Sequence, residues 1–169
     1  HNFEEDFCLK VHLRLREIFK DIKTIIAPRH IVRIKQIKYL CEKLNLNFQV
    51  LNKEDQIQED KELIIVNSFG ILNNFYKFSK SVFIGKSLIK KLKNDSGQNP
   101  IDAAKFGCKI YHGPYVYNFE EIYKILEKHK ISKKIENIDD LANYITDDFN
   151  MQTFQQGNQK LIEELGNQT

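Results

Sequence analysis

Apolar residues recur along this chain in two alternating patterns, one with the period of a helix and one in short runs. The helical period places apolar side chains every three or four positions and predicts helices over residues 4–20 and 31–44. Further helices are expected at 70–79, 100–107, 118–128, 138–149 and 154–165. Short apolar runs bounded by turn residues predict strands at 24–27, 48–51, 63–66, 82–84, 109–112 and, more weakly, 133–135.

Strands that alternate with helices of about 10 to 15 residues indicate βαβ units, and therefore an α/β fold with a parallel, doubly wound sheet. A chain of 169 residues is long enough to bury a core of its own. We expect residues 1–150 to form one domain and residues 151–169 to be the C-terminal helix and tail of that same domain.

Charge changes this picture little. The chain has 26 basic and 23 acidic residues, a net charge of +3, with the lysines scattered among Ile and Asn. This distribution favours a solvated surface over a nucleic-acid footprint, so no nucleic-acid partner is expected. The one basic run, residues 86–93 (KSLIKKLK), could contact anionic lipid or phosphate, although a solvated loop explains it more simply.

The Cys and His residues give no sign of a metal or a cofactor. Cys8, Cys41 and Cys108 are odd in number, far apart and without CxxC spacing, which argues against zinc and disulfides and fits a reducing cytosol. The five His residues lack metal-ligand spacing as well. There is no signal peptide, and no apolar run reaches the roughly 18 residues of a membrane span.

The candidate chemistry lies in the loops that follow the strands, because ligands of parallel sheets bind beyond the carboxyl ends of the strands. Arg29, in Pro28-Arg29-His30, could donate two hydrogen bonds to a phosphate. A surface arginine that caps the strand end is the simpler alternative. After the strand at 63–66, Gly70 would open a helix and let backbone N–H groups approach a ligand.

Three later loops carry turn residues. Gly85-Lys86-Ser87 lacks the GxxxxGK[ST] spacing and is no P-loop. In residues 99–102, Asn99 suits a helix cap, Pro100 the first turn and Asp102 either the helix dipole or two sugar hydroxyls. Gly113-Pro114 shapes the loop after the strand at 109–112, and Asn118 is expected to cap the next helix.

These residues suit a site that binds a ligand, not one that catalyses a reaction. No Ser/His/Asp or Cys/His triad is plausible, because the candidate groups lie far apart without a nucleophile elbow. No paired carboxylates stand out for acid–base work. The residues by themselves therefore predict binding of a phosphate and of hydroxyl groups.

Six segments, in order, match a known family. They are HNFEE at 1–5, IIAPRH at 25–30, NSFG at 67–70, VFIGKS at 82–87, GQNPID at 97–102 and HGPYVYNF at 112–119. With these segments the chain resembles, up to about residue 145, the C-terminal half of bacterial 3-deoxy-D-manno-octulosonic acid (Kdo) transferase. That family consists of two-lobed GT-B glycosyltransferases with Rossmann-like lobes, which add Kdo to lipid A precursors in lipopolysaccharide biosynthesis.

The resemblance implies a lobe that binds the donor, CMP-Kdo, without a metal. The family's cytidylate contacts fall on Pro28, Arg29, Phe69, Gly70, Ile71, Asn99, Pro100, Ile101 and Asp102, with His30, Gly85, Ser87, Gly113, Pro114 and Asn118 in support. Arg29 and the helix N-termini would stabilise the departing phosphate. The carboxylate of Asp102 would hold the ribose hydroxyls.

Four positions depart from the family pattern. Asp102 stands where the family usually has Glu, and Ile71 replaces the acidic residue of a Gly-Glu pair. Lys86 replaces the second glycine of Gly-Gly-Ser, and Gln98 replaces the His of Gly-His-Asn-Pro. The ligand class survives these changes, whereas the strength of donor binding is in question.

The resemblance also implies what the chain lacks. The family's acceptor site, carboxylate base and membrane attachment belong to an N-terminal lobe, and a strand would precede His1. We therefore expect a soluble fragment that transfers no sugar alone, cut from an enzyme at the cytoplasmic face of the inner membrane. The alternatives are a non-catalytic remnant that binds nucleotide poorly and a GT-B lobe for a different base.

Overall fold

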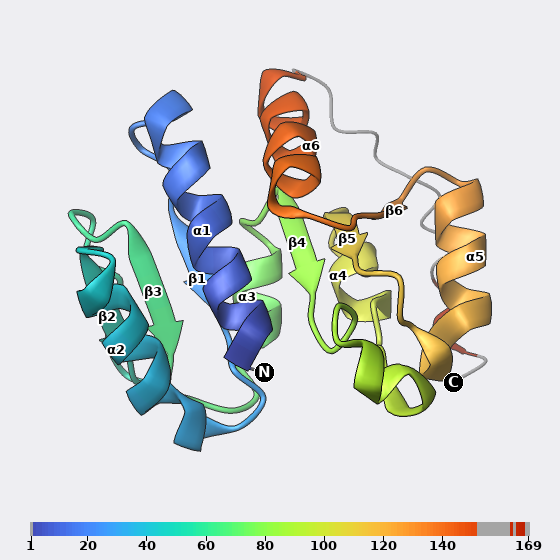
Figure 1. The fold of residues 1–169 in the computed structure, drawn as a ribbon, viewed down its shortest axis with the longest axis horizontal. Helices are drawn as coiled ribbons and strands as arrows, with labels where there is room; N and C mark the ends of the chain where they lie inside the picture. The colour runs from blue at the N-terminus through green and yellow to red at the C-terminus, as the bar shows by residue number, and fades with distance from the viewer. Residues whose placement is uncertain (1, 152–162, 164, 168–169) are drawn as a thin grey trace. The chain divides into compact units, whose positions relative to one another are not determined.

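The computed structural model describes residues 2–151, 163 and 165–167 of the chain (Figure 1). The described part forms two compact units, residues 2–75 and residues from 76 onward, here called the N-terminal and C-terminal units. Each unit is described by itself. The helix expected at 154–165 and the tail expected at 151–169 lie almost wholly outside the described residues.

The N-terminal unit alternates helices with parallel strands. Its elements are α1 (Asn2–Ile18), β1 (Thr24–Ile26), the 3-10 helix η1 (Ile31–Arg33), α2 (Ile34–Lys43), β2 (Phe48–Leu51), β3 (Leu63–Val66) and α3 (Leu72–Tyr76). The strands pair in the order β1-β3-β2, all parallel. All four residues of the central strand β3 are buried, which explains its unbroken apolar run.

The two faces of β3 pack against different helices because successive side chains of a strand point to opposite sides. Leu63 and Ile65 pack with Leu9 of α1 and Ile37 of α2. On the other face, Ile64 and Val66 pack with Phe75 of α3. The unit is thus a three-layer α/β arrangement, as the alternation of elements predicts.

A buried histidine ties α1 to the start of two strands. The His12 ring is 1% exposed, with Nε2 2.8 Å from Oε1 of Glu62 and Nδ1 2.7 Å from Oγ1 of Thr24. Because a carboxylate only accepts, the neutral ring donates from Nε2 to Glu62 and accepts at Nδ1 from the Thr24 hydroxyl. Burial lowers the pKa of His12 and outweighs the opposing effect of Glu62, which favours this neutral form.

The C-terminal unit repeats the alternation. It contains β4 (Ser81–Ile84), the 3-10 helix η2 (Lys90–Asp95), α4 (Ile101–Lys105), β5 (Lys109–His112), the 3-10 helix η3 (Tyr117–Phe119), α5 (Glu120–Lys128), β6 (Ser132–Lys134) and α6 (Ile138–Asn150). Its strands pair in parallel in the order β4-β5-β6. Ile110 of β5 lies in a core with Ile101 of α4 and Leu126 of α5.

The opposite face of β5 packs against α6. Tyr111 stacks on Tyr144 with ring centroids 6.0 Å apart, and its hydroxyl donates to Oδ2 of Asp148 at 2.6 Å. Ser81 of β4 donates to the same carboxylate oxygen at 2.8 Å. A single aspartate of α6 therefore binds two neighbouring strands.

The expected α/β class and parallel strands are confirmed, with differences in detail. The six strands are hydrogen-bonded in two sheets of three, one in each unit. The segment between β4 and α4, for which no helix was predicted, contains the 3-10 helix η2, and α3 is shorter than the predicted helix 70–79. Gly107, with φ +78°, ends α4 as expected.

All three cysteines are free thiols. Burial is the main cause that raises the pKa of each, to about 12 for Cys8 and Cys41 and to about 11 for Cys108. Cys41 and Cys108 are fully enclosed, in agreement with their expected role as small hydrophobic residues.

Thr24→Val tests the His12 tie, because it keeps the shape of the side chain and removes the hydroxyl. The buried Nδ1 then has no donor, and we expect the free energy of unfolding to fall by about 1–3 kcal/mol. Urea unfolding followed by circular dichroism measures the loss. Thr24→Ser keeps the hydroxyl and should lower the free energy of unfolding by less. An equal or larger decrease for Thr24→Ser would refute a stabilising role for the hydrogen bond to His12.

Candidate functional site

Two of the predicted loops leave the same edge of the N-terminal sheet. Because β1 and β3 are parallel neighbours, Pro28-Arg29-His30 and residues 67–71 both follow carboxyl ends of adjacent strands. Arg29 and His30 are exposed, and the Arg29 guanidinium has no hydrogen bond or ion pair within the described part of the chain. The structure thus brings the first two predicted groups together within this unit.

The loop after β3 presents both an exposed aromatic ring and free backbone. Phe69 is 69% exposed, and Gly70 has φ +77°, with nothing within 4 Å of the position a Cβ would take. Leu72 begins α3 two residues later, so Gly70 precedes the helix and does not open it as predicted. Ile71 is half-buried against the core residues around Phe75 and offers no polar side chain.

An ion pair that sequence reasoning missed anchors the loop after β1. Arg33 of η1 donates from Nη2 and Nε to the two carboxylate oxygens of Glu5 in α1. Glu5 is 7% exposed, so this bidentate pair is largely shielded from solvent. It fixes the segment that follows Arg29, and its two residues lie 28 positions apart in the sequence.

In the C-terminal unit, a buried hydroxyl joins the loops that follow β4 and β5. Ser87 is fully buried; its Oγ donates to the Ile84 carbonyl at 2.7 Å and accepts from the Gly113 N–H at 2.9 Å. The Ser87 carbonyl accepts from the Tyr115 N–H at 2.9 Å. Ser87 therefore braces the two loops and is not available to a ligand.

Gly113 allows the two loops to approach closely. A Cβ at this position would lie 2.2 Å from the Ser87 carbonyl oxygen and 2.6 Å from its carbon. Gly97 has a similar role, since it has φ +87° and a Cβ there would lie 2.9 Å from Cα of Val116. The Gly97 N–H donates to the Lys86 carbonyl at 2.7 Å, and this bond joins the two ends of the segment between β4 and α4.

The Asn99–Asp102 turn differs from the prediction by one position, since Pro100 and not Asn99 stands at the N-cap of α4. Asn99 Oδ1 accepts from the Ile101 N–H at 2.9 Å, next to Pro100 at the start of α4. Asn99 and Asp102 are exposed, whereas Ile101 is buried in the core and can offer a ligand only its backbone. The Asp102 carboxylate of this turn is thus accessible from solvent, whereas Oδ1 of Asn99 is engaged by the Ile101 N–H.

One prediction in this region is wrong. Asn118 does not cap α5, which begins at Glu120 without a side-chain cap. The Tyr117 and Asn118 N–H groups instead donate to Ser96, at its Oγ and its carbonyl, and draw the chain into η3. The Asn118 side chain donates to Oδ1 of Asp95 at 3.3 Å, so it supports the loop in another way.

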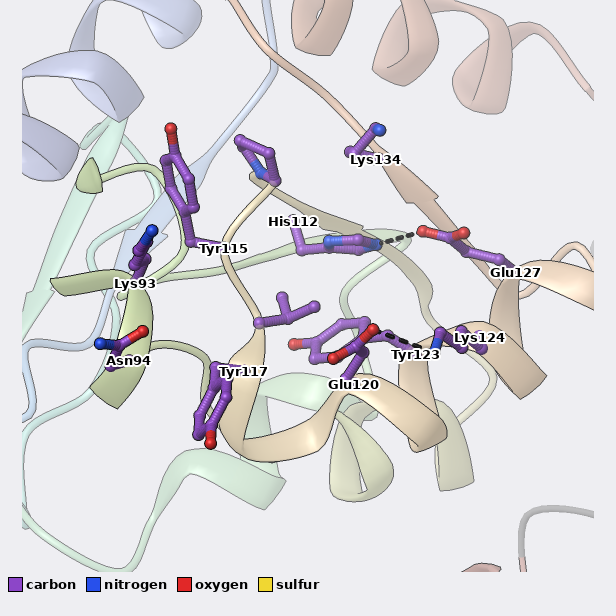
Figure 2. A pocket seen from close by; sticks show the side chains of 12 residues that line it. Lys93, Asn94, His112, Tyr115, Tyr117, Glu120, Tyr123, Lys124, Glu127 and Lys134 are labelled. Atoms are coloured by element: carbon purple, nitrogen blue, oxygen red, sulfur yellow. Dashed lines mark hydrogen bonds and ion pairs between the residues drawn. The ribbon is translucent and has the colours of Figure 1, made fainter. Parts of the chain in front are cut away.

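A cavity of about 350 Å³ lies within this unit, beside the loop that contains Pro114 (Figure 2). Its walls come from η2, the loop after β5, one face of α5 and the end of β6. Sequence reasoning missed it, although Glu120, Tyr123, Lys124 and Glu127 recur at helical spacing on one face of α5.

His112, at the end of β5, lines the cavity and has a carboxylate as hydrogen-bond partner. The ring is 2% exposed and lies 4.3 Å from the Tyr123 ring, between centroids. Nε2 is 2.9 Å from Oε1 of Glu127, and Nδ1 is 2.7 Å from the Gly113 carbonyl. Burial lowers the pKa of His112 despite the opposing effects of these two acceptors.

The described residues hold no cluster of three or more His, Cys, Asp or Glu side chains suited to a metal ion. Nor is any helix in that part of the chain both long and apolar enough to cross a membrane.

Comparison with known proteins confirms the resemblance to Kdo transferases. The chain is 29% identical to the 3-deoxy-D-manno-octulosonic acid transferase of Haemophilus influenzae over 75% of its own length. It is 30% identical to the protein of the same name from Rickettsia conorii over 86% of its length. The matches cover 29% and 30% of these relatives, so the chain spans less than a third of their length. No family model matches the chain.

A solved structure confirms the fold. The chain matches the C-terminal CMP-Kdo binding domain of WaaA from Acinetobacter baumannii with a TM-score of 0.78 and 20% identity. The match covers 89% of this chain and 76% of that one. The chain therefore has the α/β fold that the resemblance implies.

Gly113→Ala tests the close approach of the two loops. Because the new Cβ would meet the Ser87 backbone, we expect the free energy of unfolding to fall by about 1–3 kcal/mol or more. Gly107→Asn is the control, since Gly107 has open space around it and Asn tolerates positive φ. Denaturant unfolding of both variants gives the comparison, and equal losses would contradict the steric account.

Proposed function

We propose that this chain is the donor-binding part of a Kdo transferase, an enzyme that moves Kdo from CMP-Kdo to a lipid A precursor in lipopolysaccharide biosynthesis. The observation that carries the proposal is the similarity to Kdo transferases over most of the chain. The fold shared with a CMP-Kdo binding domain supports it. In the intact enzyme, the reaction would take place at the cytoplasmic face of the inner membrane.

Arg29 is proposed to bind the phosphate of the donor. Its exposed guanidinium, unpaired within the described residues, can donate two hydrogen bonds to phosphate oxygens. Pro28 and His30 flank it, and Phe69, Gly70 and Ile71 follow the adjacent strand β3, with open space on the Cα of Gly70. These groups would stabilise the negative charge on the departing cytidylate.

The turn formed by Asn99, Pro100, Ile101 and Asp102 is proposed to bind the ribose. The Asp102 carboxylate can accept hydrogen bonds from two vicinal hydroxyls, and the Asn99 side chain is held by the Ile101 N–H. Gly85, Ser87, Gly113, Pro114 and Asn118 would support this binding by bracing the loops around it.

The reaction would be an inverting transfer without a metal. An acceptor hydroxyl forms the new bond to the anomeric carbon of Kdo as the bond from that carbon to the phosphate oxygen breaks. The hydroxyl proton passes to a carboxylate base, which we place in the N-terminal lobe of the intact enzyme. CMP leaves with the bonding electrons, and Arg29 would compensate the charge on its phosphate.

A non-catalytic remnant is the second candidate, and two positions favour it. Ile71 offers no charged contact, and Asp102 is one methylene shorter than the glutamate usual in the family. Both changes would weaken donor binding without altering the fold. A measurement of nucleotide affinity separates the two candidates.

Titration of the ¹⁵N-labelled chain with CMP, UMP and GMP tests the proposal directly. We expect CMP to shift the amide signals of Arg29, Gly70 and Asn99, because phosphate and ribose would contact these segments. A response to no nucleotide would favour the remnant. A preference for UMP or GMP would favour a GT-B lobe for a different base.

Arg29→Gln separates phosphate recognition from base recognition. Loss of a charge-assisted pair should weaken CMP binding about 10-fold or more but leave cytidine binding unchanged. Isothermal titration calorimetry measures both ligands. Lys43→Gln, which removes an exposed positive charge at the end of α2, is the control. An equal loss of CMP affinity in the two variants would reject a specific role for Arg29.

A further inference from the structure

The amino ends of the strands in the C-terminal unit carry a surface that the proposed function does not use. Each strand begins at or just after a segment rich in lysine: residues 76–80 (YKFSK) for β4, 105–109 (KFGCK) for β5 and 128–131 (KHKI) for β6. Because the strands are parallel, the three segments lie at one edge of the sheet, opposite the edge at which the strands end (Figure 1). They are here called the amino-edge surface.

Backbone and side-chain contacts hold the three segments side by side. The Lys109 N–H donates to the Lys80 carbonyl at 2.9 Å, and the Lys109 ammonium group donates to the Lys130 carbonyl. Tyr76 packs on Phe106 with ring centroids 6.3 Å apart. The amino-edge surface is therefore continuous within this unit.

The charge of the amino-edge surface has one sign. Glu127 and Asp148 border it, but Glu127 pairs with His112 at 2.9 Å and Asp148 accepts hydrogen bonds from two hydroxyl groups of the sheet. The three segments contain no aspartate or glutamate and six lysines: Lys77, Lys80, Lys105, Lys109, Lys128 and Lys130.

The N-terminal unit has no such basic edge. Its corresponding segments, residues 19–23, 45–47 and 58–62, contain three lysines together with four aspartates or glutamates. Two units with the same parallel arrangement thus differ in charge at this edge. The architecture by itself does not require the lysines.

Helix stability accounts for part of the charge but not for the aromatic rings. Lys105 and Lys128 lie in the last turns of α4 and α5, where a cation complements the helix dipole, and the Lys80 ammonium group lies 4.9 Å from the centre of the Phe149 ring. Phe78, however, is 88% exposed and Phe106 is 39% exposed. Exposed apolar rings rimmed by charge are typical of a surface that contacts a partner.

Lysines and phenyl rings together match the chemistry of an anionic bilayer surface. Ammonium groups are attracted to anionic headgroups, and a phenyl ring gains free energy when it enters the boundary between headgroups and acyl chains. Single-stranded nucleic acid also suits a surface with cations and rings. The three segments contain no arginine, the side chain that grips phosphate with two donors and stacks on bases, so the lipid surface fits them better.

We propose that the amino-edge surface binds the anionic surface of a lipid bilayer. The Phe78 ring enters the boundary between headgroups and acyl chains, and the lysines around it contact the headgroups. The inference rests on this edge alone and not on the proposed donor nucleotide.

The first test is co-sedimentation of the full chain with vesicles. One set is phosphatidylcholine with about 30 mol% phosphatidylglycerol, and the other is phosphatidylcholine alone. We expect binding to the anionic vesicles only, weakened at least fivefold between about 0.05 and 0.5 M salt because salt screens the lysines. Equal binding to both sets, or binding to neither, overturns the proposal.

Variants of exposed side chains give the second test. Phe78→Ala should weaken binding to the anionic vesicles roughly tenfold at either salt concentration, because the ring no longer leaves water. Lys77→Gln combined with Lys130→Gln should weaken it roughly 20-fold at the lower salt concentration.

The controls remove the same kinds of group elsewhere. Tyr39→Ala removes a ring that is 57% exposed on α2, and Lys90→Gln combined with Lys91→Gln removes two exposed charges of the basic run 86–93. Both controls should keep the vesicle affinity of the original chain. A loss of affinity confined to the Lys90 and Lys91 variant would place the contact in that run and refute the proposal.

NMR of the ¹⁵N-labelled chain locates the contact and separates lipid from nucleic acid. Bicelles that contain phosphatidylglycerol should broaden the amide signals of residues 77–80, 105–109 and 129–131, and not those of 86–93. Broadening of the first set by a single-stranded oligonucleotide of about 20 nucleotides, but not by the bicelles, would identify a nucleic-acid site and reject the bilayer. CMP affinity should be the same in all these variants, so each proposal can fail without the other.

Discussion

Parallel hydrogen bonding between strands governs the placement of the loops that carry the candidate binding residues. Since all three strands of each sheet run in one direction, all their carboxyl ends lie at one edge, and the loops that follow them gather there. In the N-terminal unit this brings Arg29 and Gly70 to a common edge. In the C-terminal unit it brings the Ser87 and Gly113 loops into contact.

The two units use this edge differently. The N-terminal unit leaves Arg29 and the Gly70 backbone open, with the Glu5–Arg33 pair fixing the chain behind them. The C-terminal unit instead fills its edge with hydrogen bonds, in which Ser87 and Ser96 hold the loops together. Open groups suit contact with a charged ligand, whereas the braced loops give the cavity beside them fixed walls.

The sequence contains enough information for the elements and the exposed loop residues, but not for the contacts between loops. The strand β3 is recognisable because it is buried on both faces, and the Asn99 turn because its capping chemistry is local. The Ser96 bonds that override an Asn118 cap join residues about 20 positions apart, and no local pattern encodes them. The cavity was missed for the same reason, since five elements (η2, β5, η3, α5 and β6) contribute to it.

The two buried thiols make this chain a convenient host for site-specific probes. A thiol with a pKa near 12, such as that of Cys41, has at neutral pH roughly 1,000-fold less thiolate than an ordinary exposed cysteine, and the thiolate is the reacting species. A single cysteine placed on an exposed loop would therefore take up a maleimide dye well before Cys41 or Cys108. Only the partly exposed Cys8 would need replacement first, and the two cysteines that fill the cores of their units can stay.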